Sequence, residues 1–138
     1  MVKNEVFEKA LSIAVEAHRG QVDKLGMPYI LHPLEVARRV DTLELKTIAV
    51  LHDVVEDTEI TAEDLVEKGI PREIVEIVEI LTKPQGEDYE EYVRRVAKNA
   101  KARKVKLADL DHNTSPERAN GLNERLRAKY RLAREILG

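Results

Sequence analysis

Leu51-His52-Asp53-Val54-Val55-Glu56-Asp57-Thr58 is the stretch around which the rest of the chain can be organised. If residues 48–57 form one helix, a rotation of about 100° per residue gathers one histidine and three acidic residues within an arc of about 140°. Those four residues are His52, Asp53, Glu56 and Asp57. The opposite arc carries the apolar side chains of Leu51, Val54 and Val55. One face of this helix can therefore be buried while the other presents an imidazole and three carboxylates.

The acidic face of this segment is destabilising without a counter-charge. Asp53 repels Glu56 at i,i+3 and Asp57 at i,i+4, and each such pair weakens a helix by a few tenths of a kcal/mol. No lysine or arginine occurs between Lys46 and Lys68 to relieve the repulsion. A divalent cation is the simplest source of the missing positive charge, because neighbouring His and Asp side chains suit it as ligands.

The composition narrows the classes of protein that the chain can represent. A length of 138 residues favours one domain, residues 1–138, that can bury a core. The 23 Lys and Arg against 26 Asp and Glu give a net charge of -3, so no basic field indicates a nucleic-acid partner. The chain has no cysteine, which excludes disulfides, thiolate zinc sites and cysteine nucleophiles.

The sequence also bears on location. The first residues, Met-Val-Lys-Asn-Glu-Val-Phe, do not form an apolar signal region. No stretch approaches the roughly 18 apolar residues of a membrane span. We therefore expect a cytoplasmic protein that does not bind membranes. A homo-oligomer is compatible with the sequence, which does not fix the oligomeric state.

The hydrophobic spacing predicts an all-α fold. Apolar residues recur with the helical period, glycine and proline separate the segments, and no segment shows the alternation of a strand. Asn4 is expected to cap the first helix, and His32 is expected to be extended because Pro33 follows it and begins the next helix. The expected helices span about residues 4–19, 33–40, 43–57, 62–69, 71–81, 89–98, 100–113 and 122–137.

A metal site needs ligands from outside the opening stretch. The other histidines are His18, His32 and His112, and Asp109 is an acid that follows an apolar run. Asn113 lies four residues after Asp109, on the same helical face. Two imidazoles with two carboxylates suit Mn²⁺, Fe²⁺ or Zn²⁺ better than Mg²⁺ or Ca²⁺. Spacing alone does not select which of these residues meet.

Four ordered segments resemble the HD-type hydrolase domain of the RelA/SpoT family. They are Ala17-His18-Arg19-Gly20-Gln21, Gly26-Met27-Pro28-Tyr29-Ile30-Leu31-His32-Pro33-Leu34-Glu35-Val36-Ala37, the opening stretch, and Val105-Lys106-Leu107-Ala108-Asp109 with His112-Asn113. Their order and spacing match from about residue 5 to residue 137, and most closely the small stand-alone hydrolases of that family. The resemblance implies a compact multi-helix HD-domain fold with a mononuclear metal site.

The resemblance also implies roles for particular residues. A divalent metal, most often Mn²⁺, would be held by His32, His52, Asp53 and Asp109. The Glu56-Asp57 pair would act as catalytic residues around the attacking water, and Asn113 would contact the bound nucleotide. Members of the family hydrolyse the 3′-pyrophosphate of (p)ppGpp, which gives GDP or GTP and pyrophosphate. These residue types suit that chemistry, because a metal lowers the pKa of water and a carboxylate can take up its proton.

One position departs from the family pattern. Alarmone hydrolases commonly carry Arg-Lys just before the Gly-x-Pro-Tyr segment, whereas this chain has Asp23-Lys24. Lys24 keeps a cation for phosphate. An acid in place of a guanidinium that can stack on a purine weakens the expectation of guanine recognition.

The remaining polar residues are expected to have lesser roles. Lys106, three residues before Asp109, is within reach of a bound phosphate. His18 and His112 are expected to be structural or to support the metal ligands, and Tyr130 is a weak candidate for a ligand contact. Surface charge is the expectation for Arg19, Lys83, Arg118 and the basic run 125–134.

These features predict a metal-dependent phosphohydrolase whose substrate is a phosphorylated nucleotide, most specifically guanosine 3′,5′-bis(diphosphate). Two alternatives stay open: hydrolysis of a different nucleotide, which Asp23 favours, and a non-catalytic HD module that senses a nucleotide. Loss of a metal ligand or of the Glu56-Asp57 pair would indicate the sensing module, and none of these residues is missing.

Overall fold

The fold is built from helices. A computed structural model describes residues 2–119 and 121–138. The helices are α1 (Asn4–Ala17), α2 (Leu31–Arg38), α3 (Leu43–Leu51), α4 (Val54–Asp57), α5 (Ala62–Glu67), α6 (Arg72–Leu81), α7 (Tyr89–Ala97), α8 (Ala100–Asn113), α9 (Pro116–Ala119) and α10 (Glu124–Leu137). The described residues contain no strand beyond one isolated bridge between Val22 and Pro28. The all-α expectation is confirmed. No helix in this part of the chain combines the length and apolar character needed to cross a membrane.

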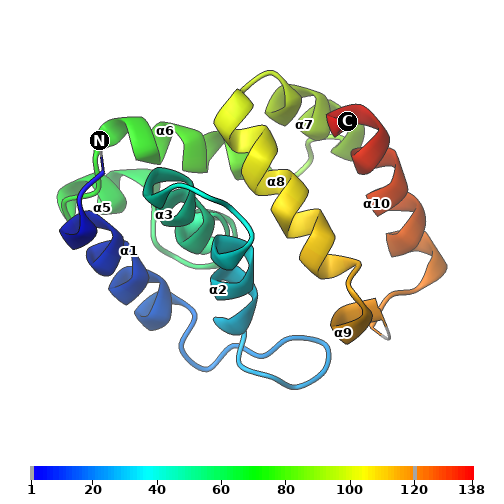
Figure 1. The fold of residues 1–138 in the computed structure, drawn as a ribbon, viewed down its shortest axis with the longest axis horizontal. Coiled ribbons are helices and arrows are strands. Elements are labelled where there is room, and N and C mark those ends of the chain that lie inside the picture. Colours follow the sequence, from blue (N-terminus) through cyan, green and yellow to red (C-terminus); the bar gives the residue numbers. More distant parts are fainter. Residues whose placement is uncertain (1, 120) are drawn as a thin grey trace.

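Helix α8 lies in the middle of the fold (Figure 1). It packs against α2, α3 and α6 on one side and against α7 and α10 on the other. Helix α1 packs against α3, and α2 lies between α3 and α8. Because α2, α3 and α8 touch one another, side chains that are far apart in the sequence can meet at one place.

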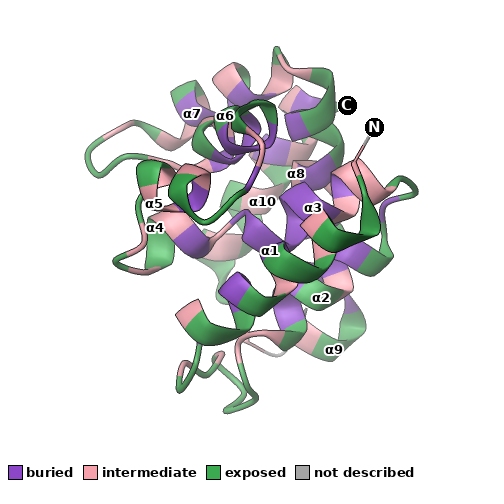
Figure 2. Ribbon diagram, turned by 90° about the vertical axis from the view of Figure 1, so that its left-hand side faces the viewer, coloured by how far each residue is buried: buried purple, intermediate pink, exposed green. Residues whose placement is uncertain are grey.

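The core is filled mainly by buried aliphatic residues of these helices. Figure 2 shows the buried residues in purple along the ribbon. Full burial of a Val, Leu or Ile side chain stabilises the folded state by about 1.5–3 kcal/mol relative to leaving it exposed. Burial of the apolar faces also fixes how each helix is rotated, and so where its polar side chains point. The largest fully buried side chains include Ile48, Leu51, Leu65, Ile74 and Leu110.

Side-chain caps begin several helices. Thr42, Thr61 and Asp88 each accept the backbone N–H of the residue three positions ahead. The prediction for the first helix is wrong: Asn4 lies inside α1, and Lys3 holds the cap position without a side-chain hydrogen bond.

The start of α2 also differs from expectation. His32 is not extended but lies in the first turn of α2, which begins at Leu31. Its N–H donates to the Tyr29 carbonyl at 2.9 Å. Pro33 is tolerated in this turn because the first N–H groups of a helix have no intrahelical acceptor.

The helix expected over residues 48–57 is interrupted: α3 and α4 are separated by His52 and Asp53. In a continuous helix the Ala49 carbonyl would accept the Asp53 N–H. Here His52 Nδ1–H donates to that oxygen at 2.6 Å, and the His52 backbone N–H also reaches it at 3.3 Å. The imidazole therefore takes the acceptor that helix continuation would use, and the chain turns at this point.

Candidate active site

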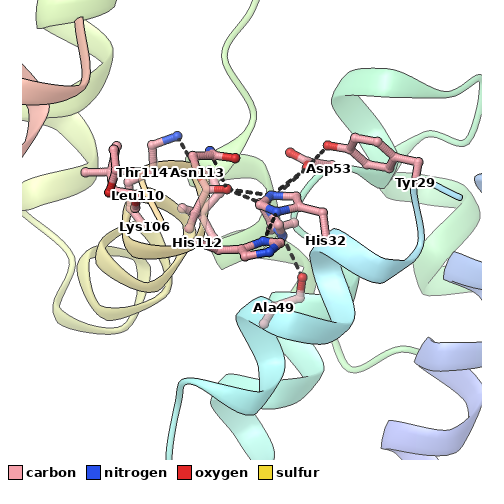
Figure 3. A network of polar contacts seen from close by, with 12 residues as sticks. Tyr29, His32, Ala49, Asp53, Lys106, Leu110, His112, Asn113 and Thr114 are labelled. Atoms are coloured by element: carbon pink, nitrogen blue, oxygen red, sulfur yellow. Dashed lines mark hydrogen bonds and ion pairs between the residues drawn. The ribbon is translucent and has the colours of Figure 1, made fainter. Parts of the chain in front are cut away.

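The four side chains predicted as metal ligands converge on one point. His32 comes from α2, His52 and Asp53 from the break between α3 and α4, and Asp109 from α8. His32 Nε2 lies 2.7 Å from Asp109 Oδ1 and 3.8 Å from Asp53 Oδ2. His52 Nε2 lies 3.1 Å from Asp53 Oδ2 and 3.4 Å from Asp109 Oδ1. Figure 3 shows the surrounding residues, with His32 between Asp53 and His112. We call these four residues the metal centre, and their role as metal ligands stays a prediction.

The orientation of His52 leaves one nitrogen free for a ligand bond. Its Nδ1–H donates to the Ala49 carbonyl, which can only accept. In the neutral imidazole, the lone pair is therefore on Nε2. This nitrogen is buried and makes no well-aligned hydrogen bond within the described residues. A buried, unpaired acceptor that faces two carboxylates fits a site for a cation.

His32 is oriented by a second histidine, as Figure 3 shows. The Nδ1 atoms of His32 and His112 lie 2.8 Å apart, so one of them must donate and the other accept. His112 Nε2 lies 3.3 Å from Glu117 Oε1, which favours a hydrogen on Nε2. His112 Nδ1 then accepts from His32 Nδ1–H, and the His32 Nε2 lone pair faces Asp109. Two acceptors 2.7 Å apart need a cation or a proton between them.

The two carboxylates of the metal centre also have outer partners. Tyr29 OH donates to Asp53 Oδ2 at 2.5 Å, and burial together with the charge of Asp53 raises the pKa of Tyr29 far above its usual range. Lys106 Nζ donates to Asp109 Oδ2 at 2.9 Å, and Asn113 Nδ2 donates to Asp109 Oδ1 at 3.3 Å. Such partners fix the orientation of ligand oxygens.

The charges of the metal centre are those of a cation site. Burial opposes the shift, but the charge of His52 lowers the pKa of Asp53 below its usual range. Burial is likewise outweighed at Asp109, where the charge of Lys106 holds the pKa well below normal. Burial alone would lower the pKa of His52, but the charge of Asp53 raises it well above normal. Lys106 supplies one positive charge to these two buried ionised carboxylates, and a proton on His52 or a metal ion can supply a second.

A family model for the HD domain matches residues 10–112. This chain belongs to the HD domain family. HD domains bind a divalent metal ion. His32, His52 and Asp109 offer ligand atoms within 4.8 Å of one another, a donor set that fits such an ion, and Asp53 Oδ2 lies beside them, 3.1 Å from His52 Nε2. The HD-domain fold predicted from the sequence is thereby confirmed, and binding of a divalent metal is a property of this family. The identity of the metal stays a prediction.

Bacterial proteins resemble this HD domain over most of its length. The guanosine-3′,5′-bis(diphosphate) 3′-pyrophosphohydrolase of Vibrio cholerae is 33% identical over 149 residues, which cover 96% of this chain and 20% of that protein. The protein of the same name from Aquifex aeolicus is 35% identical over 117 residues, covering 76% of this chain and 17% of that protein. A GTP pyrophosphokinase of Myxococcus xanthus is 32% identical over 127 residues, which cover 79% of this chain and 17% of that protein. The HD domain therefore spans 20% or less of the length of these relatives.

The HD domain also has a structural counterpart. The solved structure of a metazoan ortholog of SpoT, a protein that hydrolyzes ppGpp, matches it with a TM-score of 0.76 and 24% sequence identity. The match covers 99% of this chain and 88% of the other chain. At this level of identity the match shows that the two chains share a fold.

Glu56 and Asp57 line the same cleft of the HD domain as the metal centre. Glu56 Oε1 accepts the backbone N–H of Lys83 at 2.8 Å, which fixes its position. Desolvation of the Asp57 carboxyl group, with the charges of Asp53 and Glu56, raises its pKa to about 6. The two acids therefore differ: Glu56 is held as an acceptor, whereas Asp57 can exchange a proton near neutral pH.

The side of the cleft formed by α9 and α10 carries cations. We call Lys24, Arg118, Lys129 and Tyr130 the rim. Lys129 Nζ lies 4.3 Å from the centre of the Tyr89 ring, and burial together with the charges of Lys106 and Lys83 lowers its pKa. Of the three predicted substrate contacts, Asn113 and Lys106 line the cleft and Lys24 lines an adjoining cavity. Their contact with substrate stays a prediction.

Asp23, the acid that departs from the family pattern, makes hydrogen bonds to the backbone of its own loop. Asp23 Oδ1 accepts the N–H groups of Leu25 at 2.9 Å and Met27 at 3.0 Å. The Asp23 N–H donates to the Met27 carbonyl at 2.8 Å, and Gly26, with a φ of 82°, makes the turn between them. The Asp23 carboxylate is therefore engaged by the backbone rather than left free for a ligand.

Sequence reasoning missed part of the site. Tyr29 follows Pro28 in one of the four ordered segments and so carried a signal, but its bond to Asp53 was not foreseen. His112 was expected only to be structural or supporting, and its partner Glu117 lies in a stretch without a motif. Arg118, expected to be surface charge, is half-buried, and its Nη1 atom is shielded from solvent.

Proposed function

We propose that this HD domain is a metal-dependent phosphohydrolase, with Mn²⁺ as its metal, that cleaves guanosine 3′,5′-bis(diphosphate) into guanosine 5′-diphosphate and pyrophosphate. The observation that carries the proposal is the meeting of the metal centre with Glu56 and Asp57 in one cleft. The names of the bacterial relatives and the ppGpp hydrolysis of the metazoan protein support the choice of substrate. A single domain and a cytoplasmic location stay predictions from the sequence.

The reaction assigns separate tasks to the two acids. A divalent ion held by the metal centre supplies positive charge that favours deprotonation of the attacking water and offsets phosphate charge. Water attacks the phosphorus joined to the 3′ oxygen, the P–O bond to that oxygen breaks, and the 3′ oxygen takes up a proton. Glu56, fixed by the Lys83 N–H, orients the water. Asp57, whose pKa is about 6, carries the proton.

A panel of nucleotides tests the substrate. Protein loaded with Mn²⁺ is incubated with ppGpp and with other nucleoside 3′- and 5′-polyphosphates, and products are separated by anion-exchange chromatography. We expect pyrophosphate and guanosine 5′-diphosphate from ppGpp, and no turnover by Asp53→Ala or after chelation.

The other outcomes separate the alternatives. Cleavage of other nucleotides with ppGpp untouched would keep the reaction class and overturn the substrate, the alternative that an acid at position 23 supports. Binding of ppGpp without cleavage of any nucleotide would make the chain a sensing module and overturn the enzymatic proposal.

A further inference from the structure

Arg118 lines three neighbouring cavities of the surface. It lines the active-site cleft, a second cavity with Lys24, Gly121 and Leu122, and a third beside His112. Helix α9, which carries it, lies at the end of α8 near the loop that joins α1 and α2 (Figure 1). The cleft and the second cavity share Arg118, Asn113 and Tyr130, so they adjoin.

The guanidinium of Arg118 lacks a counter-charge. Its Nη1 atom is buried and has no hydrogen-bond partner, and the side chain forms no ion pair among residues 2–119 and 121–138. A buried donor left unsatisfied destabilises the folded protein, and more so when it is charged. Arginine is otherwise rarely buried without a partner. A charge kept at such a cost indicates a ligand that pairs with it.

The nearby acids are already engaged. Asp23 accepts two backbone N–H groups of its own loop. Glu117 lies 3.3 Å from His112 Nε2 and 3.9 Å from Arg39 Nη2. Glu35 pairs with two arginines of α2 and its C-terminal end at 2.6 and 2.8 Å. None of the three acids that line the third cavity with Arg118 is therefore paired with it.

A second cation lies beside Arg118. A Cβ atom built on Gly121 would lie 3.5 Å from Lys24 Cβ and 3.8 Å from Lys24 Cδ, so the Lys24 side chain runs against the segment that follows α9. Lys24 is exposed and also forms no ion pair among the described residues. A guanidinium and an ammonium that converge without an acid form a site for an anion with several oxygens, such as a phosphate.

We propose that Arg118, with Lys24 beside it, binds a second phosphate group of the substrate, at a distance from the phosphate that is cleaved at the metal centre. The inference rests on the proposed function and names the residue that holds the phosphates that are not cleaved. One phosphorylated end lies at the metal centre and the other lies at Arg118, with the nucleoside between them along Asn113 and Tyr130. Arg118 is therefore a binding residue that selects for the uncleaved phosphate.

Two substrates that differ only in that phosphate test the proposal. Wild type, Arg118→Gln and Arg118→Lys are loaded with Mn²⁺ and assayed on guanosine 3′,5′-bis(diphosphate) and on guanosine 3′-diphosphate, which lacks the 5′ phosphates. Since a hydrogen bond to a charged group is worth more than a neutral one, we expect Arg118→Gln to raise KM for the first substrate about tenfold or more. Its kcat, its metal content and its KM for the second substrate should not change. Arg118→Lys should fall between wild type and Arg118→Gln.

A matched control and a binding measurement complete the design. Arg103→Gln removes an exposed arginine of α8 and should match wild type on both substrates. Equal effects of Arg118→Gln on the two substrates, or none, would overturn the inference. If wild type cleaves neither substrate, the proposed function fails, and calorimetric titration with guanosine 5′-diphosphate decides the inference alone. Wild type should then bind it and Arg118→Gln should bind about tenfold more weakly, whereas equal binding would refute the assignment.

Discussion

The metal centre is enclosed by α2, the break between α3 and α4, and α8, whereas the rim across the cleft is built from a loop, the short helix α9 and the exposed helix α10. In the metal centre, the ligand groups have outer partners: His52 donates to Ala49, His32 contacts His112, and Tyr29 donates to Asp53. In the rim, Lys24 and Arg118 form no ion pair within the described residues.

This difference separates two kinds of effect. The protein itself holds the ligand atoms of the metal centre in place, so changes there should alter metal binding before anything else. The rim lacks a counter-charge until an anion binds, so changes there should alter affinity for phosphate and leave the metal in place. Each of the following variants tests whether the two regions are independent in this way.

Removal of a ligand should have the largest effect. His52→Ala deletes a buried nitrogen that faces both carboxylates, so Mn²⁺ affinity should fall by more than the roughly 100-fold that loss of an outer partner can cost. Elemental analysis after gel filtration and competition with a chelator would measure the loss. Lys129→Gln, a change in the rim, is the matched control and should keep one metal per chain. Loss of metal from Lys129→Gln as well would show that the regions are not separate, whereas full metal content in His52→Ala would overturn His52 as a ligand.

The partner of His32 should have the next largest effect. His112→Ala leaves the His32 Nδ1–H without its acceptor, so the ring is no longer fixed, and metal affinity should fall about 10- to 100-fold. His112→Asn can place an amide oxygen near the position of Nδ1 and should recover most of the affinity. Nitrogen NMR of the histidine rings would show His32 protonated on Nδ1 in wild type and His112→Asn. Equal losses in the alanine and asparagine variants would contradict the orienting role.

The comparison also shows what the sequence could reveal. The helices follow from hydrophobic spacing, because burial of one face is a local requirement repeated along each segment. The metal ligands lie in short motifs whose residue types are themselves the chemistry, so His52 and Asp53 could be predicted from the sequence alone. The break in the helix at these residues could not be predicted, since it depends on whether the His52 side chain or the Asp53 N–H donates to the Ala49 carbonyl.

The outer contacts were harder to foresee for a different reason. The bond between His32 and His112 joins residues 80 positions apart, and only the packing of α2 on α8 brings them together. Arg118 belongs to no motif, and an arginine in a polar stretch is ordinarily exposed. Arg118 is half-buried because α9 lies beside the cleft. This tertiary placement cannot be predicted from helical periodicity.

The burial of the Asp57 carboxyl group, together with repulsion by Asp53 and Glu56, should appear as a smaller effect on stability. The folded-state pKa of Asp57 is about 6 against an ordinary value of 3.8, so the folded protein holds this proton more tightly than the unfolded chain. Stability from this group is full below pH 3.8 and is lost as pH rises through 6.

Asp57→Asn removes that loss. The metal-free variant should be more stable than wild type above pH 6, by about 1 kcal/mol after allowance for solvent screening in the open cleft. The gain should vanish below pH 4 and shrink when Mn²⁺ is bound, because the ion offsets the repulsion. Urea denaturation across this pH range measures it. A gain of equal size at all pH values would rule out the ionisation of Asp57 as its cause.

The smallest effect is expected at Asp23, next to Lys24 of the rim, because its carboxylate is bonded to backbone N–H groups of its own loop. The amide oxygen that Asp23→Asn introduces can accept the same Leu25 and Met27 N–H groups, so stability should stay within about 0.5 kcal/mol of wild type. Asp23→Ala loses both bonds and should cost about 1 kcal/mol, as urea denaturation would show. If the carboxylate acts only on its loop, KM for the nucleotide in Asp23→Asn should stay within about twofold of wild type at low salt. A much lower KM at low salt that returns to the wild-type value at high salt would show instead that Asp23 repels the phosphate bound by Arg118 and Lys24, and that this charge helps set which nucleotide is accepted.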